Sequence, residues 1–209
     1  QNHCQGYQQR AVESQTKIRP DRNCVCSDLN PTGMDTFLTE CVHHSLNAYL
    51  YSNAIWLCER LYASSAVEAN AFLLATCYYR NSQEYRAYHV LKGATSPQSR
   101  YLLALCCHKL GKLPEAEEAL TIHPGSLDTQ VPGGAAGCYL LGVVCKESDR
   151  RSAAVKHFKQ ALILDPFMWC AYKELCLLGA TEEAAGILEH PDVEELIQHY
   201  VPSESLAPP

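Results

Sequence analysis

The sequence predicts an all-α protein in which about five antiparallel helix pairs stack into an α-solenoid between disordered termini. Apolar residues recur at i, i+3 and i+4 spacing, which is the period of a helix that buries one face. Turn-forming residues interrupt this pattern at short intervals, and no run of alternating β-branched residues occurs. Small residues also return at a nearly fixed interval, which indicates a repeat. Because one helix pair cannot bury its apolar face alone, stacking on neighbouring pairs must stabilise such a fold.

The helical pattern begins directly after Met34, and its first apolar face carries Phe37, Leu38, Val42 and Leu46. Beyond this face, turn signals divide the chain into about ten helices of roughly 8–14 residues. The expected breaks are Ser52-Asn53, Ser64-Ser65, Asn81-Ser82, Gly93, Ser96-Pro97, Gly111, Pro114, Pro132-Gly133-Gly134, Ser148-Asp149, Asp165-Pro166 and Gly179. The last pair, with Tyr172, Leu175 and Ala184, is expected to be shortened.

A small residue opens the second helix of four successive pairs, at Ala54, Ala87, Ala116 and Ala154. The steps between these alanines are 33, 29 and 38 residues, so the repeat is degenerate, and an insertion at 123–134 accounts for the longest step.

One copy of the repeat, residues 135–168, resembles a tetratricopeptide repeat closely. The residues in phase with that motif are Leu141, Gly142, Ala154, Phe158, Ala161 and Pro166. Cys138 and Cys145 stand where the motif has two aromatic residues. We expect Gly142 and Ala154 to allow close helix approach and Phe158 to pack against the next pair. Pro166 should end the second helix.

Three regions follow from these patterns. Residues 1–33 lack helical or strand periodicity and are expected to be a disordered or non-native leader, so we interpret Met34 as the natural start. Residues 34–189 form the repeat array, and residues 190–209, rich in proline, are the start of a flexible linker.

Composition excludes several classes of function. The formal charge of −6 and the lack of a basic cluster argue against nucleic-acid binding. No apolar stretch is long enough for a membrane span, and the first residues lack the apolar core of a signal peptide. Most of the twelve cysteines lie inside apolar runs, which indicates reduced, packing thiols in the nucleus or cytoplasm.

Catalytic and metal chemistry are not predicted. Cys106, Cys107 and His108 are adjacent, but consecutive residues on a helix point about 100° apart, and nothing supplies an oxyanion hole. Gly133-Gly134 lacks the lysine and preceding strand of a phosphate-binding loop. Paired zinc-ligand steps such as C-x-x-C do not occur. We therefore expect no enzyme, no cofactor and no metal.

A binding function is the remaining expectation. In such repeats the first helix of each pair lines a concave groove. The expected groove residues are Phe72, Thr76, Tyr79, Arg80, Tyr101, Leu105, His108, Lys109, Tyr139, Val143 and Lys146. This aromatic and apolar surface suits an apolar helix, although ordinary packing between repeats would also explain its tyrosines. The Lys/Asn/Arg clamp with which some repeats grip a terminal carboxylate is absent.

Several longer segments resemble one particular family within this repeat class. NAIWLCERLYA (53–63), AFLLATCYYRNSQEYRAYHVLKG (71–93) and PQSRYLLALCCHKLGKLPEAEEAL (97–120) resemble the N-terminal repeats of the cell-division-cycle-twenty-seven family. VPGGAAGCYLLGVVCKESDRR (131–151) and DPFMWCAYKELCLLGATEEA (165–184) extend the match and look like the plant branch. That family is a scaffold subunit of the anaphase-promoting complex, or cyclosome, a cell-cycle ubiquitin ligase.

The resemblance implies a non-catalytic scaffold that homodimerises and assembles with other subunits of that complex. In such a dimer each groove clasps the partner's first helix, so the expected contacts are Phe37, Leu38, Val42 and Leu46 against Phe72, Tyr79, Tyr101 and Tyr139. Two alternatives stay open. One is a generic adaptor that binds another partner's peptide in the groove, and the other is a cysteine-dependent hydrolase or redox protein with one thiol of depressed pKa.

Overall fold

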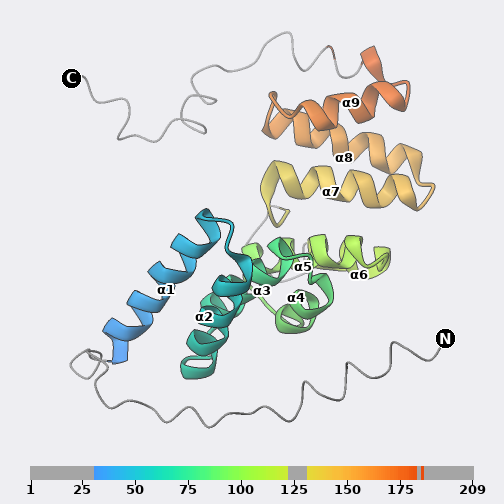
Figure 1. Ribbon diagram of the computed structural model, residues 1–209. Coiled ribbons are helices and arrows are strands. Elements are labelled where there is room, and N and C mark those ends of the chain that lie inside the picture. The colour runs from blue at the N-terminus through green and yellow to red at the C-terminus, as the bar shows by residue number, and fades with distance from the viewer. Residues whose placement is uncertain (1–30, 122–130, 183–184, 186–209) are drawn as a thin grey trace, which may run out of the picture. The chain divides into compact units, whose positions relative to one another are not determined.

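The computed structural model describes residues 31–121, 131–182 and 185, and this part of the chain is all α-helical (Figure 1). Its helices are α1 (Pro31–Asn47), α2 (Tyr51–Ser64), α3 (Glu68–Arg80), α4 (Glu84–Leu91), α5 (Pro97–Lys109), α6 (Leu113–Leu120), α7 (Gly134–Glu147), α8 (Arg151–Leu164) and α9 (Trp169–Leu177). The chain splits into two compact units between Phe37 and Leu38, and the contacts described here are those of residues from Leu38 onward. The predicted α-solenoid is confirmed.

Each helix that opens a pair ends in the same turn. The turn residue has a positive φ in all five cases, at Tyr49, Ser82, Gly111, Asp149 and Gly179. The next residue donates its N–H to the carbonyl five positions back, as Leu50 does to Ser45 (2.8 Å) and Ala180 to Leu175 (2.9 Å). This is the Schellman arrangement, which satisfies the last carbonyls of a helix and reverses the chain within three residues.

A buried alanine follows each of the first four turns. Ala54, Ala87, Ala116 and Ala154 have no exposed surface, and each donates its N–H to the residue that completed the turn before it. Because alanine adds only a methyl group, the second helix of a pair can lie close to the first at this point. The spacing predicted from the sequence therefore marks real helix contacts.

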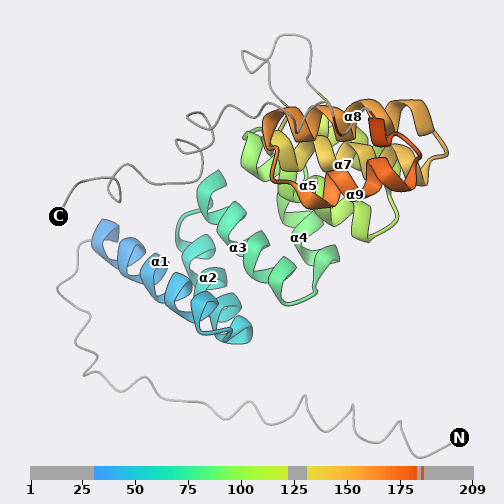
Figure 2. The ribbon, with the colours of Figure 1, turned by 90° about the horizontal axis from the view of Figure 1, so that it is seen from above.

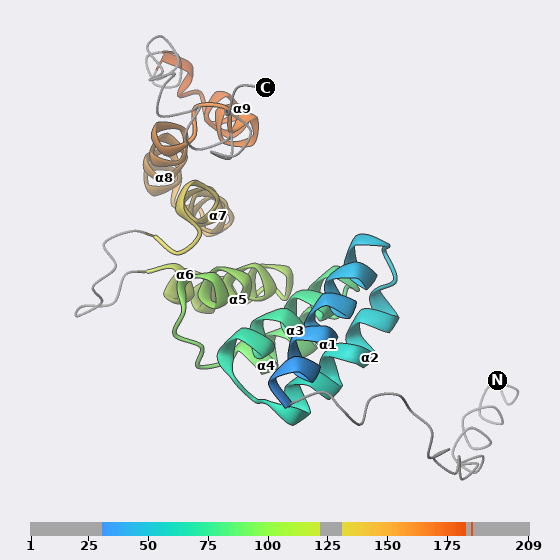
Figure 3. The same cartoon turned by 90° about the vertical axis from the view of Figure 1, so that its left-hand side faces the viewer.

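The strongest repeat copy packs as a tight pair. Phe158 of α8 is fully buried, and a Cβ built on Gly142 of α7 would overlap its ring. The same cluster contains Ala171 and Leu175 of α9, so Phe158 joins its own pair to the next, as its position in the motif predicted. Figure 2 shows α7, α8 and α9 running nearly parallel or antiparallel, and Figure 3 shows them nearly end-on.

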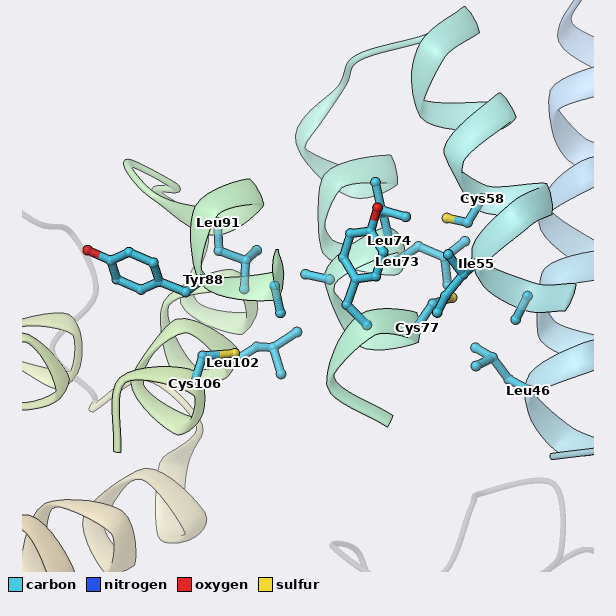
Figure 4. Packing of buried hydrophobic residues seen from close by; sticks show 14 of the residues in the cluster. Leu46, Ile55, Cys58, Leu73, Leu74, Cys77, Tyr88, Leu91, Leu102 and Cys106 are labelled. Carbon is cyan, nitrogen blue, oxygen red and sulfur yellow. The ribbon is translucent and has the colours of Figure 1, made fainter. Parts of the chain in front are cut away.

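The N-terminal pairs share a second core. Figure 4 shows Ile55 and Cys58 of α2 facing Leu73, Leu74 and Cys77 of α3, with Leu46 of α1 on the far side of α2. The same cluster continues through α4 to Leu102 and Cys106 of α5. Cysteine serves here as a small apolar side chain between closely packed helices.

Two details differ from the sequence prediction. The first break lies at residues 48–50, and Ser52-Asn53 fall inside the first turn of α2, where Asn53 Nδ2 donates to Ser45 Oγ (2.8 Å). Polar residues favour helix starts as well as turns, so the sequence alone placed this break four residues late. Helix α1 also begins at Pro31, three residues before Met34.

Parts of the domain prediction lie outside the described residues. This holds for residues 1–30 of the expected leader, for the expected linker at 190–209, and for Ala184 of the fifth pair. Thr181, Glu182 and Ala185 are helical, so a helix starts after the fifth turn, where the repeat predicts one.

A carboxylate joins α3 to the turn between α4 and α5. Glu68 Oε1 accepts hydrogen bonds from the backbone N–H groups of Ser96 (2.8 Å) and Thr95 (3.1 Å), and Oε2 accepts one from Thr95 Oγ1 (3.1 Å). These bonds, with that from Ser96 first, hold the pKa of Glu68 at about 2. Since this pKa is depressed on folding, the stabilisation is present above the usual value of 4.5 and is lost as the pH falls toward 2.

Glu68→Gln should therefore flatten the loss of stability between pH 4.5 and pH 2, because an amide has no proton to gain there. Urea midpoints measured across this window would check it. Glu84→Gln is the matched control, since Glu84 occupies the first turn of α4 as Glu68 occupies that of α3. Equal acid slopes in the wild type and the Glu68 variant would contradict the assignment.

Gly142→Ala should lower the free energy of unfolding by about 1–2 kcal/mol, because the added methyl overlaps the Phe158 ring. An ordinary glycine inside a helix gives the opposite sign, since alanine is favoured there by about 1 kcal/mol. Phe158→Leu removes the obstructing ring, so the double variant should recover much of the loss caused by Gly142→Ala. Additive effects in this cycle, measured by urea denaturation, would show that the two side chains do not clash.

Candidate functional site

The first helices of successive pairs present side chains at matching positions. We call the surface formed by Phe72, Tyr79, Tyr101, Leu105, Tyr139 and Val143 the A-helix face. All six side chains are half-buried, and they come from α3, α5 and α7. The structure thus places the aromatic residues predicted from the sequence on one set of helices, partly packed and partly accessible.

Tyr101 is covered on one side by the chain itself. Val131 packs against the same core cluster as Tyr101, and a Cβ built on Gly133 would lie 2.5 Å from Tyr101 Cδ2. Burial is the main reason that the pKa of Tyr101 is raised. The last residues of the insertion therefore shape this part of the face, and only a residue without a side chain fits at Gly133, which also has a φ of +83°.

Tyr79 and Tyr139 also combine packing with exposure. Burial raises the pKa of both hydroxyls, followed by smaller effects of Cys106 on Tyr79 and of Cys170 on Tyr139. The Tyr139 ring lies 5.7 Å from that of Phe158. Each ring therefore packs on a core cluster and leaves part of its surface accessible.

Ion pairs join the first helices at the border of the A-helix face. His108 Nε2 of α5 lies 3.0 Å from Glu147 Oε1 of α7, and Lys146 Nζ of α7 lies 2.6 Å from Glu174 Oε2 of α9. Arg80 and Lys109, which the sequence placed at the rim, are exposed. The surface is thus apolar in its centre and charged at its edge, which suits a helix or peptide with an apolar stripe.

The first-helix residues divide into two groups. Val42 and Leu46 are buried in the same core as Ile55 and Cys58 of α2, so they hold α1 to its own chain. Leu38 is half-buried against this core, whereas Phe37 is 54% exposed. Of the four predicted contacts with a second copy, Phe37 offers the most free surface.

Sequence reasoning missed the residue at the matching position of α9. The turn residues Asp149 and Gly179 are 30 residues apart, so Trp169 of α9 corresponds to Tyr139 of α7, and its ring is 69% exposed. The repeat spacing, continued into the fifth pair, was the signal that could have found it.

Most of the described thiols are buried, and burial dominates their pKa values. Burial raises the pKa of Cys106 to about 12 and that of Cys107 to about 11, so both stay protonated at neutral pH. A hydrogen bond with Cys58 lowers the pKa of Cys77 and raises that of Cys58, but both side chains are fully buried. His108, the candidate base, pairs with Glu147 instead.

The described residues show neither a cluster of metal ligands nor a membrane-spanning helix. No three His, Cys, Asp or Glu side chains converge there as metal ligands would. None of the described helices has the length and apolar character needed to cross a membrane.

Comparison with known sequences gives the family. Residues 47–122 match the family described as anaphase-promoting complex, cyclosome, subunit 3. Cell division cycle protein 27 homolog B of Arabidopsis thaliana is 51% identical over 156 residues, which cover 74% of this chain and 21% of that protein. The Homo sapiens homolog is 40% identical over 148 residues, which cover 66% of this chain and 18% of that protein. The chain thus spans about a fifth of the length of these curated relatives.

Solved structures agree on the fold. The structure described as "Cdc27 N-terminus" matches with a TM-score of 0.59 at 20% identity, covering 79% of this chain and 83% of that one. The structure of the APC/C hetero-tetramer Cut9-Hcn1 matches with a TM-score of 0.68 at 24% identity, covering 78% of this chain and 33% of that one. At these identities the likeness concerns the helical-repeat fold.

Alkylation should follow burial rather than any special activation. Cys170, which is exposed, should react with iodoacetamide well before the buried Cys58, Cys77, Cys106, Cys107, Cys138 and Cys145. Peptide mass spectrometry over a time course would give the order, and urea should remove the protection of the six buried thiols. Rapid labelling of Cys77 in the folded chain would instead favour the cysteine-dependent alternative.

Proposed function

The chain belongs to the cell division cycle protein 27 family, and we propose from this premise that it is a non-catalytic scaffold and homodimerisation module of the anaphase-promoting complex. In this role it acts in ubiquitin-dependent proteolysis during mitosis and contacts other subunits of the complex. The A-helix face is the observation that carries the proposal. It offers partly exposed aromatic and aliphatic side chains on three stacked helices, with charges at its edge.

A second copy of this chain is the proposed occupant of that face. Of the four predicted first-helix contacts, Phe37 and Leu38 have accessible surface, whereas Val42 and Leu46 pack in the same core as α2. The proposed contact therefore sets Phe37 and Leu38 of one protomer against Phe72, Tyr79, Tyr101 and Tyr139 of the other. Aromatic anchors that enter apolar surface carry much of the free energy of association in such interfaces.

The absence of catalysis is part of the proposal and is supported by the thiols. The pKa values of Cys106 and Cys107 are raised by burial, and the pair Cys58–Cys77 is sealed in the core. The nine cysteines in the described residues are free rather than disulfide-bonded, which supports the proposed location in the reducing nucleus and cytoplasm.

The test is the solution mass of the chain, measured by light scattering under reducing conditions across a dilution series. We expect twice the mass of one chain at micromolar concentration. Tyr79→Ala should raise the dissociation constant of the dimer at least tenfold, because it removes a large aromatic side chain from the face. Far-UV circular dichroism should show unchanged helicity.

Tyr85→Ala is the matched control, because Tyr85 is exposed on α4, outside the A-helix face. Its dimer should equal that of the wild type. A helical monomer in the wild type at all concentrations would sink the homodimer and favour the alternative, an adaptor whose A-helix face binds an apolar helix or peptide of another partner. A dimer that Tyr79→Ala leaves unchanged would place the interface elsewhere.

A further inference from the structure

Two cations lie at equivalent places on neighbouring first helices. Arg80 is the last residue of α3 and Lys109 is the last residue of α5, and each stands two residues before the turn residue that closes its helix. Both side chains are exposed at the edge of the A-helix face. Within the described residues, neither of them forms an ion pair. Their charge is therefore available to a partner.

The helix dipole accounts for the position of these cations but not for their use. A cation is favoured at the end of a helix, where the last carbonyls carry a partial negative charge of about half an elementary charge. That charge is too small to neutralise Arg80 or Lys109. The repeat does not require a cation there either, because the matching place of α7 holds Glu147, which pairs with His108 (3.0 Å).

Carboxylates are scarce around the two cations. Helix α5 has no aspartate or glutamate. The one carboxylate of α3, Glu68, lies at the other end of that helix, where it binds the backbone N–H groups of Thr95 and Ser96. Burial raises the pKa of Tyr79, and a smaller effect of Glu84 adds to it, so this carboxylate of α4 offsets part of the positive charge nearby. The edge of the face still keeps an excess of positive charge.

Helix α1 has the opposite charge. It contains Asp35, Glu40 and two histidines, and it has no lysine or arginine. Glu40 is exposed and follows Phe37 by three residues, so both side chains lie on the same side of the helix. Val42 and Leu46 are buried instead. The surface that α1 offers to a second copy thus combines an aromatic side chain with a carboxylate.

The spacings on the two surfaces fit each other. Phe37 and Glu40 are about 4.5 Å apart along α1, at a rise of 1.5 Å per residue. Helices α3 and α5 contact each other, and packed helices lie about 8–10 Å apart, so a carboxylate between their ends comes within reach of both flexible cationic side chains. Since Arg80 directly follows Tyr79, a helix that packs Phe37 on that tyrosine brings its carboxylate to the same edge.

We propose that Glu40 of one protomer pairs with Arg80 and Lys109 of the other, and that this pairing sets the register in which α1 enters the A-helix face. The inference rests on the proposed homodimer and names the charges that make a second copy the preferred occupant. Aromatic side chains tolerate sliding along an apolar surface, whereas a carboxylate between two cations has one favourable position. A two-fold dimer contains this contact twice, so each substitution acts twice.

Charge reversal tests the pairing in a dilution series followed by light scattering at low ionic strength. Glu40→Lys should raise the dissociation constant of the dimer roughly tenfold or more, because it brings like charges together. The chain has a formal charge of −6, so this change lowers the general repulsion between two copies, and a weaker dimer would report the local contact. Added salt should reduce the effect, because exposed charges are screened.

The decisive experiment mixes two variants. Arg80→Glu with Lys109→Glu should also raise the dissociation constant, and each variant alone should be a monomer at a concentration where the wild type is a dimer. An equimolar mixture with Glu40→Lys should recover the mass of a dimer. In the mixed dimer one contact has both signs reversed and the other is that of the wild type, so both are favourable. Chains that had merely lost their fold would not recover the dimer, and circular dichroism checks each variant separately.

Arg60→Glu is the matched control. Arg60 is an exposed arginine of α2, outside the A-helix face, and its guanidinium lies 4.1 Å from the centre of the Trp56 ring. The dissociation constant of this variant should equal that of the wild type. A control that weakens the dimer as much as Arg80→Glu with Lys109→Glu would show that net charge, rather than the proposed contact, sets the affinity.

The outcomes separate this inference from the proposed function. A wild-type dimer that both charge reversals leave unchanged would overturn the charge pairing and leave the homodimer standing. The same conclusion would follow if the two variants, each still helical, stayed monomeric when mixed. A wild type that is monomeric at every concentration would remove the homodimer and the charge pairing together.

Discussion

The left-handed residue that closes each first helix sets the geometry of this protein. At Tyr49, Ser82, Gly111, Asp149 and Gly179 the chain reverses through the same pair of backbone hydrogen bonds. Three of these residues are not glycine, so the chain adopts a costly backbone conformation there rather than alter the turn. With the reversal fixed, the second helix returns beside the first, and after each of the first four turns a fully buried alanine lies four residues beyond the residue that completes the turn.

The A-helix face is continuous because successive helix pairs have the same geometry. Since every first helix starts from a comparable position, Phe72, Tyr101 and Tyr139 fall at equivalent places on successive helices. The ion pairs His108–Glu147 and Lys146–Glu174 then bridge neighbouring first helices at the edge of the face. Such partly exposed pairs add little stability, but they fix which side chains stand next to each other.

Most of the fold could be predicted from the sequence because the residues that determine it are local and periodic. Gly142, Phe158 and the four buried alanines could be identified from spacing alone, since close helix approach leaves few side chains that fit. Contacts between distant segments could not be identified in this way. Nothing in the sequence shows that Gly133 lies on Tyr101, that Glu68 holds the turn at Ser96, or that His108 faces Glu147. The same limit explains why Val42 and Leu46 were expected at an interface, since a helical stripe does not tell which neighbour buries it.

An array built by stacking has two ends, and each end exposes the surface that an inner pair would cover. At the C-terminal end of the described residues Trp169 is exposed, and helix α8 carries Arg151, Lys156 and Lys159 without an aspartate or glutamate. The A-helix face runs along the successive pairs instead, and its side chains are half-buried on each of its three helices. An interface on that face therefore needs a partner that follows several pairs, as an elongated helix or a second array does. The length of this surface is the physical reason to assign it to another chain.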